Sequence, residues 1–212
     1  MSQSQGWEPP TSPLRSAPLS FRQRILTLAG LFAVDSFGTG LLGQSLASYW
    51  FFTRFGISAQ ELGLMFFASH LLTATSLWVA ARLAGRIGLV NTMVFTHVPS
   101  SLLLIAIPFL PEAWMAILFW LVRAFFVRMD APTSQSYTMA VVGPEERSAI
   151  AAATSVSRSA GIAAGPAAAT ALWGAASASV PFVVGGVVKI IYDLTLWVLF
   201  RRVKPPEEAS DS

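Results

Sequence analysis

Six long apolar segments constrain the fold of this 212-residue chain more than any other feature. They occupy residues 25–52, 62–84, 89–109, 114–139, 148–173 and 180–200. Each is near the ~20 residues that a helix needs to cross ~30 Å of hydrocarbon. Charged residues make up only 12% of the chain, about half the share of an ordinary soluble domain. The sequence therefore predicts an all-α membrane protein, with six transmembrane helices in one bundle over residues 25–203.

The two ends of the chain differ from this bundle. Residues 1–24 are rich in Ser, Pro and Gln, which predicts a disordered cytoplasmic tail or linker, and residues 204–212 are expected to form a cytoplasmic tail. A secretory signal is not expected, because the apolar run begins only at Ile25.

Loop charge predicts the orientation of the spans. With both termini in the cytoplasm, Arg54 is the one basic loop residue on the outer side. The cytoplasmic side then holds Arg15, Arg22, Arg24, Arg82, Arg86, Arg147, Arg201, Arg202 and Lys204. Cytoplasmic loops of membrane proteins carry such an excess of Lys and Arg. We therefore expect both termini to be cytoplasmic, in a multi-pass protein of a prokaryotic inner or plasma membrane.

Composition excludes several classes of function. The 14 Lys and Arg residues are dispersed among apolar segments, which argues against nucleic acid as a partner. The chain has no cysteine, so it offers no thiolate for a metal site or a covalent nucleophile, and we expect no metal and no cofactor. An intramembrane serine protease would need a histidine on a later helix than its serine, and no histidine follows His97. The sequence therefore indicates that this is not an enzyme.

Charged residues inside the spans are the first candidates for function, because each costs at least ~2.5 kcal/mol on insertion scales. Asp35 lies near the middle of the first span and Arg123 at similar depth in the fourth. Asp35 is interpreted either as one side of a buried salt bridge with Arg123 or Lys189, or as a proton or cation site in a cavity. Arg123 offers a fork of donors for an anionic group, or stabilises the bundle with a carboxylate.

The other intramembrane polar residues have simpler interpretations. Lys189 and Asp193 are four residues apart, so they lie on one helix face and are predicted to form a buried charge pair. Arg158 stands among serines, and we expect it to be solvated within a polar network. His70 and His97 are interpreted as hydrogen-bonded residues between helices.

Small residues dominate the fifth span. Gly161-Ile-Ala-Ala-Gly165 has the GxxxG spacing that lets two helices approach closely in lipid. Pro166 follows directly and lacks the backbone N–H of a helical residue, so it permits bending. We therefore expect Gly161, Gly165 and Pro166 to serve helix packing or bending.

Two motifs resemble those of the major facilitator superfamily of secondary transporters. The segment Ala81-Arg-Leu-Ala-Gly-Arg86-Ile-Gly88-Leu-Val is similar to the family's G-x-L-A-D-R-x-G-R-K loop, although Ala81, Gly85 and Leu89-Val90 depart from it. By this resemblance Arg82, Arg86 and Gly88 belong to a conformational loop motif. Residues 161–166 are similar to the family's G-x-x-x-G-P motif. Residues 129–137 and 142–147 are similar to the end of the tenth helix and the loop after it.

The resemblance covers roughly residues 24–204 and implies an architecture. Family members have twelve helices in two six-helix halves, and each half consists of two inverted three-helix repeats around a midplane site. This chain is most similar to the C-terminal half. The first and fourth spans would then line the cavity. The resemblance thus makes Asp35, Gln44, Arg123 and Tyr137 the candidates for binding substrate or coupling protons.

Two hypotheses about function remain open. The first is a half-size facilitator-type transporter subunit in the lipid bilayer that moves a small-molecule solute, with proton-coupled efflux as one form. It would need a second six-helix half, either another chain or a second copy of this one. The alternative is a non-transporting structural or assembly subunit of a larger membrane complex, derived from a transporter half.

Overall fold

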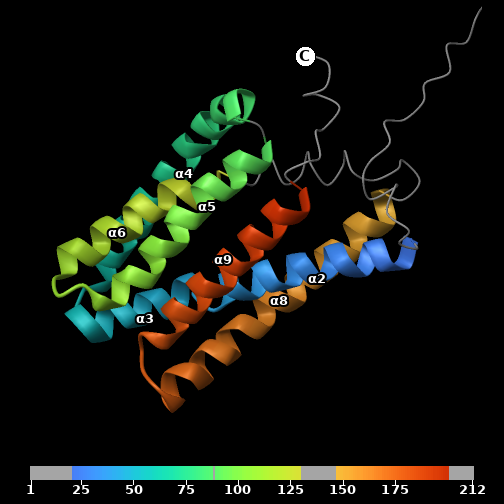
Figure 1. The fold of residues 1–212 in the computed structure, drawn as a ribbon. Coiled ribbons are helices and arrows are strands. Elements are labelled where there is room, and N and C mark those ends of the chain that lie inside the picture. Colours follow the sequence, from blue (N-terminus) through green and yellow to red (C-terminus); the bar gives the residue numbers. More distant parts are fainter. Residues whose placement is uncertain (1–20, 88, 130–146, 201–212) are drawn as a thin grey trace, which may run out of the picture.

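Helices account for all the regular structure in the described part of the computed structural model, which comprises residues 21–87, 89–129 and 147–200 (Figure 1). The elements are α2 (Phe21–Gly40), α3 (Gln44–Phe55), α4 (Ala59–Ile87), α5 (Leu89–Ala106), the 3-10 helix η1 (Ile107–Phe109), α6 (Ala113–Phe126), α8 (Arg147–Ala175) and α9 (Val180–Phe200). Over these residues there is no strand, which confirms the all-α class for the part described.

The first apolar segment is not one continuous helix, and this corrects the expectation for residues 25–52. α2 ends at Gly40 and α3 begins at Gln44, because the chain turns at residues 41–43. Gly43 has extended backbone angles, with φ −56° and ψ 154°, and glycine is a weak helix former. Leu41 and Leu42 within the turn are buried, so the break is packed into the bundle. The fourth segment also differs: α6 ends at Phe126, and residues 130–139 lie outside the described part.

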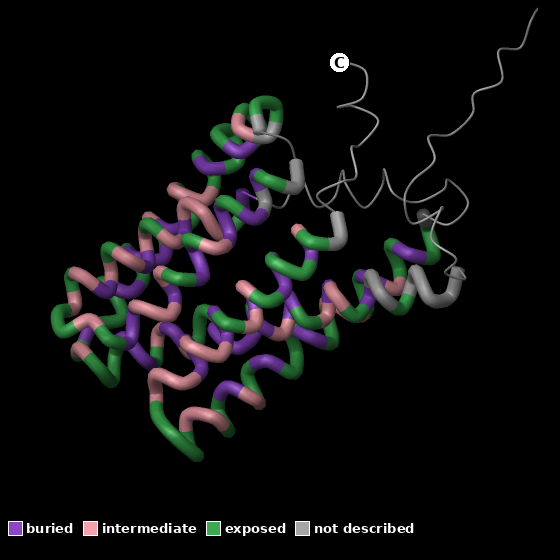
Figure 2. The backbone as a smooth tube through the Cα atoms, in the orientation of Figure 1, coloured by how far each residue is buried: buried purple, intermediate pink, exposed green. Residues whose placement is uncertain are grey.

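Length and hydropathy single out two possible membrane spans among the described residues. Residues Ala59–Leu83 and Val180–Val198 are long and apolar enough to cross a bilayer, each with a mean hydropathy of 1.5. Val94–Phe109 and Ala113–Phe126 are apolar but shorter. Many large apolar side chains are exposed on the helices, including Leu64, Phe67 and Phe95, and Figure 2 shows exposed and buried residues alternating along them. The count of six spans stays a prediction.

Three helix pairs make the most extensive contacts: α2 packs on α8, α5 on α9, and α4 on α6. α9 also contacts α2, and α5 also contacts α6. Long helices adjacent in sequence run in alternate directions in Figure 1, so the starts of α2, α5 and α8 lie toward the same end as the ends of α4, α6 and α9. α9 thus lies between α2 and α5, a position that determines which side chains it meets.

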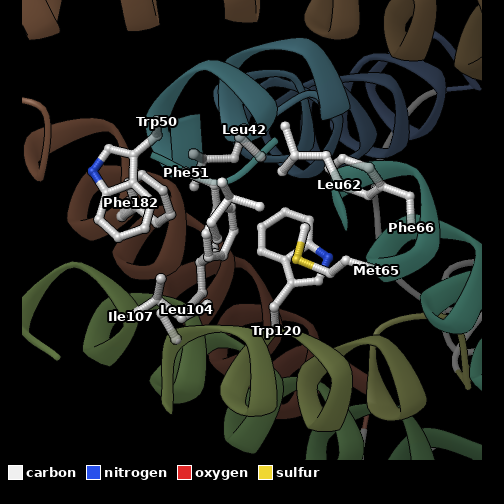
Figure 3. Packing of buried hydrophobic residues seen from close by; sticks show 13 residues of the cluster. Leu42, Trp50, Phe51, Leu62, Met65, Phe66, Leu104, Ile107, Trp120 and Phe182 are labelled. Atoms are coloured by element: carbon white, nitrogen blue, oxygen red, sulfur yellow. The ribbon is translucent and has the colours of Figure 1, made fainter. Parts of the chain in front are cut away.

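An aromatic cluster fills the end of the bundle opposite to the starts of α2, α5 and α8 (Figure 3). The ring centroids of Trp50 and Phe182 are 4.8 Å apart, and Trp120 meets Phe51 at 5.8 Å and Phe66 at 5.9 Å. Aromatic pairs at such distances add about 0.5–1.5 kcal/mol each beyond their buried area. The cluster joins α3 to α4, α6 and α9. Because it begins at the first turn of α9, it leaves the later turns of that helix to a polar site.

Candidate functional site

A buried ion pair joins α2 to α9. The Nζ atom of Lys189 donates a hydrogen bond to Oδ1 of Asp35 at 2.8 Å, and both residues are at least 93% buried. A Cβ atom placed on Gly38 would lie 3.2 Å from Cγ of Lys189, so the lysine stem runs across the glycine that stands three residues after Asp35. Of the two cations considered for Asp35 from the sequence, Lys189 is its partner.

A second buried contact joins α9 to α5. Nδ1 of His97 lies 3.1 Å from Oδ1 of Asp193, and both residues are almost fully buried. This arrangement corrects the expectation that Lys189 and Asp193 form one pair. The two side chains do lie one turn apart on α9, but that helix is packed between two neighbours. Lys189 therefore reaches the carboxylate on α2, whereas Asp193 reaches the imidazole on α5.

His97 also contacts the end of α6. Its Nε2 atom lies 3.3 Å from the backbone carbonyl oxygen of Val127, the C-cap residue of α6. Oδ2 of Asp193 is buried and accepts no hydrogen bond within the described part of the chain. One imidazole thus connects α5, α6 and α9, in agreement with the interpretation of His97 as a residue between helices.

The helix that carries His97 has a polar stripe that sequence reasoning did not identify. Thr92, Thr96 and Ser100 are spaced four residues apart and are buried, as is Ser101, which follows His97 by four residues. Thr96 satisfies its hydroxyl by donating to the carbonyl oxygen of Thr92 at 2.8 Å. The four-residue spacing of hydroxyl residues in an otherwise apolar segment was the signal that could have revealed this face.

Arg123 occupies a separate position on α6. Its Nε atom is buried and has no hydrogen-bond partner among the described residues, while its guanidinium carbon lies 5.2 Å from the centroid of the Trp120 ring. The structure does not join Arg123 to Asp35, which is paired with Lys189. A buried donor without an acceptor is costly, so Arg123 is a position where an anionic group would be stabilised.

The remaining candidates from the sequence lie away from these buried polar contacts or outside the described residues. Gln44 is exposed at the first turn of α3. Tyr137 and Gly88 lie outside the described residues. In the loop motif, Arg82 places its guanidinium carbon 3.3 Å from the centroid of Trp78, and Arg86 is exposed.

The GxxxG segment packs α8 against α2. A Cβ atom on Gly165 would overlap the backbone of Gly40, and one on Gly161 would lie 2.5 Å from the carbonyl oxygen of Ala33. Pro166 lies within α8 and cannot donate to the carbonyl of Ile162. That oxygen faces Gly40, where a Cβ atom would stand 2.7 Å from it. Glycine on both helices is therefore required for this close backbone approach.

Two further observations concern helix contacts. Arg158, expected within a polar network, is half-buried, and its guanidinium carbon stacks 4.9 Å from the ring centroid of Phe32 on α2. Gly185 and Gly186 of α9 were not identified from the sequence. A Cβ atom on Gly186 would clash with Ile105 of α5, and one on Gly185 would lie 3.3 Å from the carbonyl oxygen of Gly38. A Gly-Gly pair inside an apolar span was the available signal.

Comparison with known proteins agrees with the sequence motifs. A family model of the Major Facilitator Superfamily matches residues 28–212, which is most of the chain. No curated protein matches the sequence. The resemblance drawn from the loop motif and the glycine motif is thereby confirmed at the level of the family. The chain belongs to the Major Facilitator Superfamily, and it is therefore a transporter-type membrane protein.

Proposed function

We propose that this chain is a half-size secondary transporter subunit that moves a small solute across the cell membrane together with a second six-helix half. In this proposal six spans form two inverted three-helix repeats, and both termini are cytoplasmic. The helix pairs support such a repeat. In this proposal the six spans are, in order, α2, α4, α5, α6, α8 and α9. Exchanging the first three spans for the last three maps the α2–α8 contact onto the α6–α4 contact, and the α2–α9 contact onto the α6–α5 contact. The α5–α9 contact maps onto itself.

The observation that carries a transport role is the buried polar seam across α2, α9 and α5. Asp35, Lys189, Asp193 and His97 are all buried there in two contacts of 2.8 and 3.1 Å. Ionisable groups inside a membrane bundle are expensive, and in transporters they mark substrate and proton pathways. The stabilisation of a bundle alone does not require four of them, because small residues already pack α2 on α8.

Asp35 and Lys189 in the seam, and Arg123 at its separate position on α6, have roles in the proposal. Asp35 exchanges Lys189 for a proton during the transport cycle, which couples flux to a proton gradient. Arg123, whose buried Nε has no hydrogen-bond partner among the described residues, binds an anionic group of the solute. The solute is therefore a small anion or an amphiphile with an anionic group.

The first experiment identifies the second half. The protein is extracted from its native membrane in a mild detergent, and the mass and every chain of the particle are determined. We expect a dimer, or a one-to-one complex with another six-helix chain. A larger assembly without a second transporter half would contradict the proposal.

The second experiment tests coupling in vesicles that contain this particle. A panel of small organic anions is offered with and without an imposed pH gradient, and uptake is measured. We expect Asp35→Asn to abolish gradient-dependent uptake, whereas Glu112→Gln, which changes an exposed carboxylate before α6, leaves it unchanged. Normal gradient-dependent uptake by a folded Asp35→Asn protein would rule out the coupling role.

One observation favours the alternative of a non-transporting subunit. Asp35 is neutralised by Lys189, and Asp193 is held by His97, so these charges are paired without a solute. A wild-type particle without any uptake supports the non-transporting subunit. Where the wild-type particle shows gradient-dependent uptake, the reversed variant Asp35→Lys with Lys189→Asp distinguishes a coupling role of Asp35 from a purely structural pair. If the pair is only structural, the reversed protein assembles and behaves as the wild type. If Asp35 exchanges a proton during transport, the reversed protein folds but has no gradient-dependent uptake.

A further inference from the structure

The contacts of His97 with Val127 and Asp193 restrict its protonation. The carbonyl oxygen of Val127 can only accept a hydrogen bond, so Nε2 must carry a hydrogen for the 3.3 Å contact to be a bond. At the other ring nitrogen, either Nδ1 donates to the carboxylate of Asp193, or a protonated Asp193 donates to Nδ1. In both cases the two side chains together hold one proton more than a neutral histidine beside a carboxylate.

The surroundings favour this extra proton. Lys189 and Asp35 neutralise each other next to the site, so a protonated His97–Asp193 pair leaves these four residues without net charge. Among Asp35, Lys189, His97 and Asp193, loss of the proton would leave one net negative charge, which is unfavourable in a low-dielectric interior. The other ionisable residues on the helices that contact α5 or α9 are the buried Tyr192 of α9, Arg123 and exposed Arg128 at the end of α6, and the exposed Glu61, His70, Arg82 and Arg86 of α4. On α2 and α8 they are Arg22, Arg24, Arg147 and half-buried Arg158.

We propose that His97 and Asp193 form a proton-binding site whose occupancy determines whether α5 holds the end of α6. When the proton leaves, it departs from Nε2 to water, because the Nδ1 hydrogen is held by the carboxylate in a charge-assisted bond. The hydrogen bond to Val127 is then lost, and a lone pair on Nε2 faces a lone pair on the carbonyl oxygen of Val127. The last carbonyls of a helix have no donor within that helix, so Val127 must find a new partner and α6 shifts.

The backbone of α5 is suited to such a shift. Pro99 lies inside α5, two residues after His97, and has no N–H to donate to the carbonyl oxygen of Phe95. The helix therefore lacks one of its own hydrogen bonds within a turn of the imidazole. Movement at His97 needs to disrupt less of the α5 backbone than it would in an uninterrupted helix.

This site deepens the proposed function and rests on it for any role in transport, but proton binding and helix movement can be measured without flux. The chain has no cysteine, so two introduced cysteines can be spin-labelled specifically. The cysteines are introduced as Phe95→Cys on α5 and Val122→Cys on α6, because both positions are exposed. The separation of the two labels is measured in lipid nanodiscs from pH 5 to pH 9. The ring nitrogens are followed in parallel by nuclear magnetic resonance, because the chain has only two histidines.

We expect the label separation to change by about 1–2 Å in one pH-dependent step, which is the scale of helix shifts at interfaces. The ring signal of His97 should change over the same pH range. His97→Gln should abolish the step, and the matched variant His70→Gln, at the other histidine, should leave it intact. If His97→Gln does not fold, Asp193→Asn serves instead, because its amide keeps a hydrogen-bonding group but holds no exchangeable charge.

Two results would overturn the proton site: a label separation that is constant with pH in the wild-type background, or a step that persists in His97→Gln or stays at the same pH in Asp193→Asn. Neither result bears on whether the particle transports a solute. Conversely, a pH-dependent step in a particle without any flux would support the proton site while contradicting the proposed function. The two proposals can therefore fail separately.

Discussion

The α2–α8 contact and the contacts of α9 with α2 and α5 hold the bundle by different means. Between α2 and α8 the backbones touch through Gly40, Gly161 and Gly165. α9 also approaches its neighbours through glycine, but its later turns contribute Lys189 and Asp193 to buried polar contacts. In lipid, close packing and polar contacts are two independent ways to associate helices. The first fixes a distance by shape, whereas the second depends on protonation.

This difference suggests which part of the molecule moves. A glycine contact does not change with protonation, since it depends only on the absence of side chains. A contact through carboxylate, amine and imidazole changes its strength when a proton binds or leaves. We therefore infer that α2 and α8 move as one unit and that rearrangement takes place along α9.

The largest expected effect comes from breaking the ion pair between Asp35 and Lys189. Asp35→Asn leaves a buried lysine without its carboxylate, and removal of one partner of a buried pair costs about 3–5 kcal/mol. Lys189→Met should cost a similar amount. The double variant should be more stable than either single variant, because no unpaired charge remains. Stability is measured as the midpoint of thermal unfolding in detergent, with Glu112→Gln as the control.

Additive losses in the double variant would contradict the pairing of Asp35 with Lys189. They would mean that the two groups act independently, and the contrast between the two interfaces would then disappear.

An intermediate effect is expected from a single methyl group at the glycine contact. Gly165→Ala places a Cβ atom into the backbone of Gly40, and such overpacking costs about 1–3 kcal/mol. Gly174→Ala on the same helix is the matched control, because a Cβ atom there would meet nothing within 4 Å. Alanine is the better helix former, so Gly174→Ala should raise the unfolding midpoint. Equal shifts in the two variants would show that helix propensity, not contact, determines the result.

The sequence predicted those features that depend on local pattern. Apolar segments located the helices, and the spacing of Gly161 and Gly165 predicted close packing, because both follow from a few consecutive residues. The presence of buried charges was also predicted. For Asp35, Lys189 was one of two partners considered, since the cations available to it are few.

Features that depend on helix neighbours could not be predicted in the same way. The spacing of Lys189 and Asp193 correctly placed them on one face, but their partners depend on the position of α9 between α2 and α5. The position of the break after Gly40 could not be read from the sequence, because the apolar run continues through Leu41 and Leu42 into α3. The connection of His97 to Val127 joins residues thirty positions apart, which no local pattern encodes.

The smallest effect should come from Arg158, a cation in the α2–α8 interface. It is half-buried and stacks on Phe32, and such cation–π contacts contribute about 0.5–1 kcal/mol at partly exposed sites. We therefore expect Arg158→Gln to lower the unfolding midpoint far less than Lys189→Met, although each variant removes one positive charge. Phe32→Leu should cost more than Arg158→Gln, because Phe32 is buried and its ring surface is lost as well, and the two changes together should cost less than the sum of the single losses. A loss as large as that of Lys189→Met would instead place a carboxylate partner at Arg158, and the α2–α8 interface would then depend on charge as the contacts of α9 do.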